Sequence, residues 1–241
     1  MDILYVLGNG SKWSNNELRY SLRSVERFCK NVGRIYVCGS DPGFLSNEVR
    51  FVPCEDTKKA KHKNIIAKIE KVIKETCISD EFLLSSDDHF FIDYVDLDKY
   101  PYYSCGELPK NVLSTNGYDK SLFDTRVVLT ALGLPCKATN PHLDTHIRKD
   151  LFAKTEDIRK ASELTSNGYE INCILGNMMI AEGVEFEHVA DCKIRHCDGV
   201  SGLKNKLTGR HCFSIADSSI SEGVGDYLKN LFPRLSKYEC V

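Results

Sequence analysis

The stretch FLLSSDDHFFI, residues 82–92, decides how the chain is expected to fold. An apolar run stops at two adjacent aspartates, Asp87 and Asp88, and a second apolar run begins directly after His89. Two like charges in a half-buried position repel each other and lose hydration, so the arrangement is costly unless a positive charge lies between them. A turn between two strands is one explanation, because aspartate favours turns. A divalent-cation site at the end of a central strand is the other.

The residues before this stretch alternate between strand and helix patterns. Ser14 and Glu17 form a capping-box pattern, which predicts a helix from there to about Cys29. Apolar residues at helical spacing predict a second helix over residues 63–76. Short β-rich runs predict strands over 3–8, 34–39, 49–54 and 81–86. This alternation favours one α/β domain with a mostly parallel central sheet flanked by helices.

Polar residues follow two of the predicted strands. Gly8, Asn9 and Gly10 come after the first strand, and Asp87 and Asp88 come after the fourth. Ligands of parallel α/β sheets bind beyond the carboxyl ends of the strands. Both groups are therefore candidates for one site, with the glycines letting the backbone approach a ligand. Carboxylates at such a position can hold Mg²⁺ or Mn²⁺, which prefer oxygen ligands and keep coordination sites open for phosphate.

Two basic segments are candidates for binding an anion. Arg19 and Arg23 are four residues apart on one face of the helix that follows the glycine loop, and this predicts a phosphate site unless the face is merely solvated. Lys63 lies near the start of the next helix, beside Asn64, where a cation is mildly unfavourable. A bound anion explains that placement, and an exposed basic turn explains it as well.

The second half of the chain is less regular. Helix patterns occur near 122–132 and 155–166, and a short helix should end at Pro233. His142, Asp144 and His146 are expected to converge in one loop, as acid, base or metal ligand, or else to be ordinary surface residues.

The composition excludes several classes of protein. A net charge of −2 gives no overall nucleic-acid-binding signature, although a local basic face stays open. No apolar run approaches the roughly 18–20 residues that span a bilayer. The 11 cysteines are scattered without a C-x-x-C pair, and the start does not resemble a signal peptide, so reduced thiols in a cytoplasmic protein are expected.

The helix segment NNELRYSLRSVERF (15–28) resembles the second conserved region of the Stealth-type sugar-phosphate transferases, which continue to an Asp-Asp strand end like FLLSSDDHFF. The same order of strand, helix and acidic strand end is similar to the nucleotide-binding half of GT-A-type glycosyltransferases. HKNIIAKI and LFPRLSKYE resemble parts of small phage and bacterial glycosyltransferase-like proteins. Stealth proteins usually begin with a Trp-Val-Asp-Gly type motif, where this chain has LGNGSKW, so glycosyl transfer is expected rather than sugar-phosphate transfer.

The resemblance implies a division of labour within one domain. Residues 1–95 would bind a nucleotide sugar, expected to be a uridine diphosphate (UDP) sugar, and residues 96–241 would bind the acceptor. Asp87 and Asp88 would bind the ribose and a Mn²⁺ or Mg²⁺ ion. The residues expected to contact the diphosphate or hold its loops are Arg19, Arg23, Lys63 and Asn64. Those expected to act on the acceptor side are His142, Asp144 and His146.

The acceptor is expected to be a glycan or a hydroxymethylated base in phage DNA. Lys204, Lys206 and Arg210 would supply part of the basic strip that DNA requires. The remaining alternatives are a sugar-phosphate transferase and a non-catalytic module that binds a nucleotide or sugar.

Overall fold

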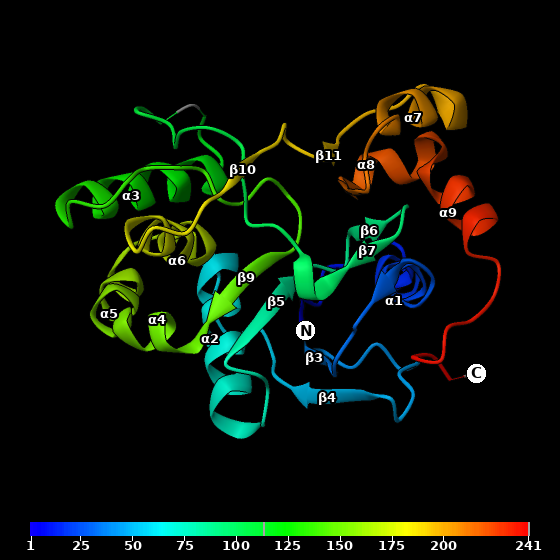
Figure 1. The fold of residues 1–241 in the computed structure, drawn as a ribbon, viewed down its shortest axis with the longest axis horizontal. Helices are drawn as coiled ribbons and strands as arrows, with labels where there is room; N and C mark the ends of the chain where they lie inside the picture. The colour runs from blue at the N-terminus through cyan, green and yellow to red at the C-terminus, as the bar shows by residue number, and fades with distance from the viewer. Residues whose placement is uncertain (113, 241) are drawn as a thin grey trace.

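A five-stranded sheet forms the centre of the computed structural model, which describes residues 1–112 and 114–240 (Figure 1). Strands β1, β3, β4 and β5 are parallel, and β9 joins antiparallel beside β5. In spatial order the strands are β4 (Val49–Pro53), β3 (Ile35–Gly39), β1 (Asp2–Leu7), β5 (Glu81–Ser85) and β9 (Thr145–Arg148). The predicted α/β domain with a mostly parallel sheet is confirmed.

Helices cover both faces of this sheet, because successive strand residues point to opposite sides. On one face, Tyr5 and Leu83 pack with Leu22 of α1 (Asn16–Phe28). On the other face, Leu4 packs with Ile69 of α2 (Lys61–Glu75). That second core also includes side chains of α4 (Lys149–Lys154) and α6 (Ile171–Ala181).

Helix α1 does not begin with the predicted capping box. Its N-cap is Asn15, which has a left-handed backbone (φ 56°) and makes no side-chain capping hydrogen bond; Ser14 is left-handed too. The hydroxyl of Ser11 accepts hydrogen bonds from the backbone N–H groups of Trp13 and Asn15 and donates to the Glu17 carboxylate at 2.8 Å. Ser11 therefore takes the organising role that the sequence assigned to Ser14.

A second, three-stranded sheet begins where β5 ends. The chain leaves the central sheet at Ser85, turns at Asp87 and Asp88, and enters β6 at His89. Strand β6 pairs antiparallel with β12, and β12 pairs parallel with β11. The strands are β6 (His89–Phe91), β12 (Cys212–Ile215) and β11 (Lys193–Ile194). The acidic pair is thus a turn between strands and also a junction between two sheets.

The other elements mostly build two lobes above the sheets. They are β2 (Cys29–Lys30), β7 (Val95–Asp96), η1 (Leu97–Lys99), β8 (Tyr103–Ser104), α3 (Gly117–Ala131), α5 (Glu156–Leu164), β10 (Glu187–His188), α7 (Gly199–Leu207), α8 (Asp217–Ser219), η2 (Ile220–Val224) and α9 (Gly225–Leu231). Helix α3 begins earlier than predicted because Asn116 caps it, accepting a hydrogen bond from the N–H of Asp119. Helix α9 ends just before Pro233, as predicted.

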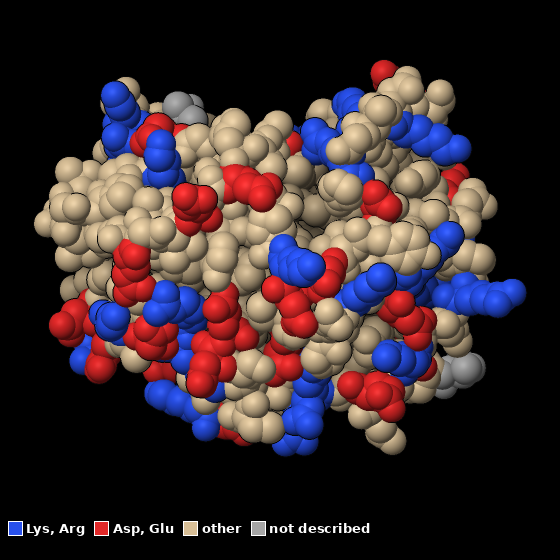
Figure 2. Space-filling model, viewed as in Figure 1, with Lys and Arg blue, Asp and Glu red and all other residues tan. Residues whose placement is uncertain are grey.

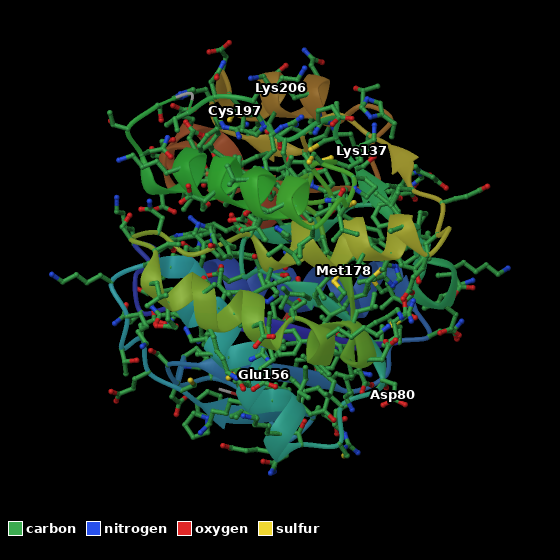
Figure 3. All side chains as sticks on the ribbon, turned by 90° about the vertical axis from the view of Figure 1, so that its left-hand side faces the viewer. Asp80, Lys137, Glu156, Met178, Cys197 and Lys206 are labelled. Carbon is green, nitrogen blue, oxygen red and sulfur yellow. The ribbon has the colours of Figure 1, made fainter. Side chains whose placement is uncertain are left out.

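One lobe carries α3 and α6, and the other carries α7, α8 and α9 (Figure 1). The space-filling outline is notched between them (Figure 2). Figure 3 shows Lys206 of α7 near the top and Asp80, directly before β5, in the lower part, so β5 starts on the side of the molecule away from α7. In the part of the chain that the structure describes, no helix has the length and apolarity to cross a bilayer.

Candidate active site at the carboxyl edge of the sheet

The glycine loop and the acidic turn lie at the ends of neighbouring strands. Strands β1 and β5 pair in parallel, with Tyr5 opposite Ser85, so Gly8 and Asp87 follow at the same edge. The buried ammonium of Lys68 donates to the carbonyl of Leu7 at 2.7 Å and to the carboxylate of Asp56. This lysine ties the end of β1 to the loop after β4, which fixes the backbone beneath the exposed Asn9 and Gly10.

The two aspartates of the turn have different electrostatic environments. Burial and the neighbouring Asp88 carboxylate raise the pKa of Asp87 to about 7, against the opposing charge of Lys61. Burial also acts to raise the pKa of Asp88, but the neighbouring His89 and Lys193 outweigh it and lower that pKa. The Lys193 ammonium lies 2.9 Å from Asp88 Oδ2. A positive charge is therefore present beside the turn, and it comes from lysines.

His89 connects Asp88 to a buried carboxylate. Its Nδ1 lies 2.9 Å from Asp144 Oδ1, which also accepts a 2.8 Å hydrogen bond from the hydroxyl of Ser85. The other ring nitrogen, Nε2, lies 3.8 Å from Asp88 Oδ1. A carboxylate bound to one imidazole nitrogen fixes the orientation of the ring. Asp144 therefore acts on the site through His89, which it holds facing Asp88.

His142 is held by Asp191, which lies two residues before Lys193. Its Nδ1 is 2.8 Å from Asp191 Oδ1, and its backbone is left-handed (φ 56°), a strained conformation for histidine. Asp191 also accepts from the backbone N–H of Lys193 and from Arg195. Burial acts to raise the pKa of Asp191, but His142 and Arg195 outweigh it and lower that pKa. The ring of Tyr118 packs against His142, with centroids 5.7 Å apart.

His146 does not join this group. Its Nδ1 lies 2.8 Å from Glu81, its Nε2 lies 2.9 Å from the carbonyl oxygen of Tyr100, and Tyr102 stacks on its ring. With both nitrogens engaged in a buried setting, His146 has none free to act as base or ligand. The predicted convergence of His142, Asp144 and His146 is not found. Asp144 contacts His89, and His142 contacts Asp191. His146 contacts Glu81 and Tyr100 instead.

Arg19 and Arg23 are both engaged by one buried glutamate. Both bind Glu239, Arg23 through two hydrogen bonds of 2.8 Å and Arg19 through one of 3.1 Å. The guanidinium of Arg19 also stacks on Phe44, 3.8 Å from the ring centroid. These contacts hold the segment around Glu239 against α1. A contact between either arginine and a diphosphate stays a prediction.

At the start of α2, Lys61 has a different environment from Lys63 and Asn64. Lys63 donates to the carbonyl of Glu163, and Asn64 makes two hydrogen bonds to the backbone of Lys58, so both hold loops rather than face the acidic turn. Lys61 is exposed, and its charge acts on both aspartates of the turn. Of this basic segment, Lys61 is therefore the residue that belongs to the candidate site.

Sequence reasoning missed Lys193, Asp191 and the linking role of His89. His89 stands inside the stretch that drew attention to the site, so its position was the available signal. Lys193 and Asp191 lie in VADCKIRH, which has no motif, and Lys193 is 105 residues from its partner Asp88. Only the pairing of β11 with β12 brings them to the turn.

The fit of the site to a divalent cation is limited. Two carboxylates offer oxygen ligands of the kind that Mg²⁺ and Mn²⁺ prefer. Within residues 1–112 and 114–240, however, no group of three or more His, Cys, Asp or Glu side chains is placed to hold a metal ion. Asp88 is already paired with Lys193, and burial and Asp88 raise the pKa of Asp87 to about 7. The arrangement does not fit a resident cation, and the predicted Mn²⁺ or Mg²⁺ stays a prediction.

No protein-family model matches the sequence, and no curated protein sequence matches it either. Among solved structures, the chain is similar to a nucleoside-diphosphate-sugar pyrophosphorylase from Vibrio cholerae, with a TM-score of 0.51 and 12% identity over 95% of this chain and 100% of that one. A glycosyltransferase involved in the glycosylation of the major capsid of PBCV-1 aligns over the same shares at 12% identity, with a TM-score of 0.45. The first likeness shows that this chain shares the fold of that pyrophosphorylase.

Proposed function

We propose that the chain is a glycosyltransferase that moves a sugar from a nucleotide-sugar donor to an acceptor. The donor that we propose is a UDP-sugar. The observation that carries the proposal is the carboxyl edge of the sheet, where an open glycine loop lies beside an acidic turn flanked by Lys61 and Lys193. A donor of this class carries hydroxyl groups for carboxylates to accept from and a diphosphate for ammonium groups to bind.

The donor would lie across the ends of β1 and β5. The backbone at Gly10 leaves space for a nucleoside, since a Cβ there would meet no atom within 4 Å, whereas a Cβ at Gly8 would lie 3.4 Å from Asp56 Oδ2. Asp87 would accept hydrogen bonds from sugar hydroxyls. The exposed ammonium of Lys61, at the start of α2, would contact the diphosphate from the other side of the turn.

The acceptor would enter from the notch between the two lobes. His142, paired with Asp191, is the candidate base on that side, because a carboxylate on Nδ1 directs the other ring nitrogen outward as a proton acceptor. Tyr118, beside His142, offers a ring face of the kind that sugars stack on. Taking the proton from an acceptor hydroxyl would make its oxygen the nucleophile at the anomeric carbon, while the nucleoside diphosphate leaves.

Calorimetric titration with UDP, GDP, CDP and ADP tests the donor site, and release of free sugar from the matching nucleotide sugars tests the chemistry. We expect one nucleoside diphosphate to bind, Asp87→Asn to weaken it, and slow hydrolysis of the corresponding donor. Binding without any hydrolysis would favour the non-catalytic module. If none of the four nucleotides bound, the proposal would be wrong.

The nature of the acceptor is a separate question with a specific surface to test. Lys204, Arg210 and His211 line a cavity of about 410 Å³ together with Tyr227, while Lys206 donates to the carbonyl of His196. Lys and Arg side chains gather over α7 in Figure 2. For a DNA acceptor, duplex binding should weaken steeply as salt rises and should fall in Lys204→Ala. A glycan acceptor predicts no gel shift at any salt concentration.

A further inference from the structure

The second sheet carries Lys193 to the acidic turn. His89, the first residue of β6, lies opposite Ser214 of β12, and Ser214 lies opposite Lys193 of β11. The three residues are in register across adjacent strands, and the backbone N–H of Ile215 donates to the carbonyl of Asp88. The ammonium that meets Asp88 at 2.9 Å is thus positioned by strand pairing and not by a flexible loop.

Asp191 restrains Lys193 from its other side. The Asp191 carboxylate accepts from the backbone N–H of Lys193 at 3.1 Å, and it also binds His142 and Arg195 at 2.8 Å each. The side chains of Lys193 and Asp88 are each 24% exposed, so the pair is accessible to a ligand without being freely solvated. A lysine ammonium has three N–H donors. One donates to Asp88, and two remain for other acceptors.

A bound diphosphate is stabilised by positive charge beside it. When the diphosphate leaves the donor sugar it gains negative charge, so the need for positive charge increases. Divalent cations usually supply that charge. Here Asp88, the carboxylate that such a cation would use, already holds an ammonium, and within the described residues no third ligand completes a metal site. Lys61 adds a second ammonium on the α2 side.

We propose that Lys193, held by Asp88 and assisted by Lys61, takes the place of a divalent cation, so that this site binds and stabilises the diphosphate leaving group without metal. The inference rests on the proposed function and deepens it. Asp88 is then a positioning residue for Lys193. As the bond between the anomeric carbon and the diphosphate oxygen breaks, the electron pair stays on that oxygen, and the two ammonium groups stabilise the added negative charge.

The test is titration of UDP and, as a probe that needs no base recognition, inorganic pyrophosphate, each in EDTA and in Mn²⁺. We expect the wild-type protein to bind with affinities that agree within about twofold in the two conditions. Lys193→Met keeps the aliphatic stem and removes the charge, and it should weaken binding in EDTA at least tenfold, or about 1.4 kcal/mol. Lys193→Arg should recover part of the loss.

A second readout separates this role from a structural one. In Lys193→Met the Asp88 carboxylate loses its ammonium partner and becomes free to bind a cation, so Mn²⁺ should restore the binding that is weakened in EDTA. The matched control is Lys229→Met, which removes another lysine with a carboxylate partner from the same lobe and should bind like wild type. Thermal unfolding of each variant checks that the fold persists.

The outcomes are distinguishable. Wild-type binding that requires Mn²⁺, or Lys193→Met binding as tightly as wild type in EDTA, would overturn the role of Lys193 and leave the transferase proposal standing. Absence of nucleotide and pyrophosphate binding by wild type in both conditions would overturn both.

Discussion

Replacing Arg23 with methionine should destabilise the fold without weakening donor binding. The Glu239 carboxylate has a fully buried side chain and accepts two hydrogen bonds from Arg23, one from Arg19 and two from Ser236. Removing one partner of a buried ion pair costs about 3–5 kcal/mol because the remaining charge is left without compensation. Since Arg19 and Ser236 stay in place, we expect the lower end, about 3 kcal/mol.

That loss is large enough to measure in two ways. For a domain of this size about 3 kcal/mol corresponds to a fall of roughly 6–12 °C in Tm. Urea unfolding followed by circular dichroism gives the free energy directly. Burial acts to raise the pKa of Glu239, but Arg23 outweighs it and lowers that pKa. The wild-type advantage should therefore be complete above the unfolded-state pKa of glutamate and should shrink as the pH falls through the lowered pKa.

Arg27→Met is the matched control, because Arg27 lies on the same helix and its hydrogen bond to the carbonyl of Leu231 is exposed. It should cost less than about 1 kcal/mol. An unfolding free energy of Arg23→Met within about 0.5 kcal/mol of wild type would refute the reasoning from burial, since that is the range of surface substitutions. A tenfold loss of UDP affinity in a folded Arg23→Met protein would show instead that this arginine contacts the diphosphate, as the sequence predicted.

Three further predictions concern other parts of the molecule. The contribution of Asp87 to stability should fall as pH rises from about 4 to 7, because its pKa is raised to about 7 and the folded state binds the extra proton; Asp87→Asn should remove this contribution, so that the difference between its urea unfolding free energy and that of wild type changes with pH over this range. His62→Leu should cost about 1.5–3 kcal/mol in the same assay, because it removes the contact at 2.6 Å between His62 Nδ1 and the buried Glu170 carboxylate, and an unchanged unfolding free energy would contradict this. Gly176→Ala should cost about 1–3 kcal/mol by overpacking, because its Cβ would lie 2.2 Å from Thr139 Oγ1; an unchanged Tm in a thermal scan would show that Thr139 moves aside freely.

The central sheet was predictable because its signals are local. Apolar runs followed by Gly8 and by Asp87 indicate strand ends without information from distant parts of the chain. Parallel pairing of the two strands then brings these ends to one edge of the sheet. Helix α1 was predictable from the spacing of its apolar residues. The residue that organises its start, Ser11, lies outside the expected capping box of Ser14 and Glu17.

The candidate site was only partly predictable, because its charges are paired over long distances in sequence. The arginine face of α1 indicates an anion, and in the structure both arginines pair with Glu239, which is 216 residues from Arg23. His146 lies two residues after Asp144 on one strand face, but β9 runs away from the edge, so His146 lies opposite Leu83 and meets Glu81 instead. A motif gives residue types and spacing, whereas strand direction decides how far each side chain lies from the edge.

Strand β4 has a consequence for solubility. As the outermost strand of a five-stranded sheet, it has no neighbouring strand on one side among residues 1–112 and 114–240. Such a row of N–H and C=O groups is a template on which other chains can assemble. Here β4 is short, Arg50 places an exposed charge on it, and the exposed Pro53 at its end has no N–H to donate. These features discourage a second molecule from extending the sheet, and they protect the chain from aggregating through its own edge.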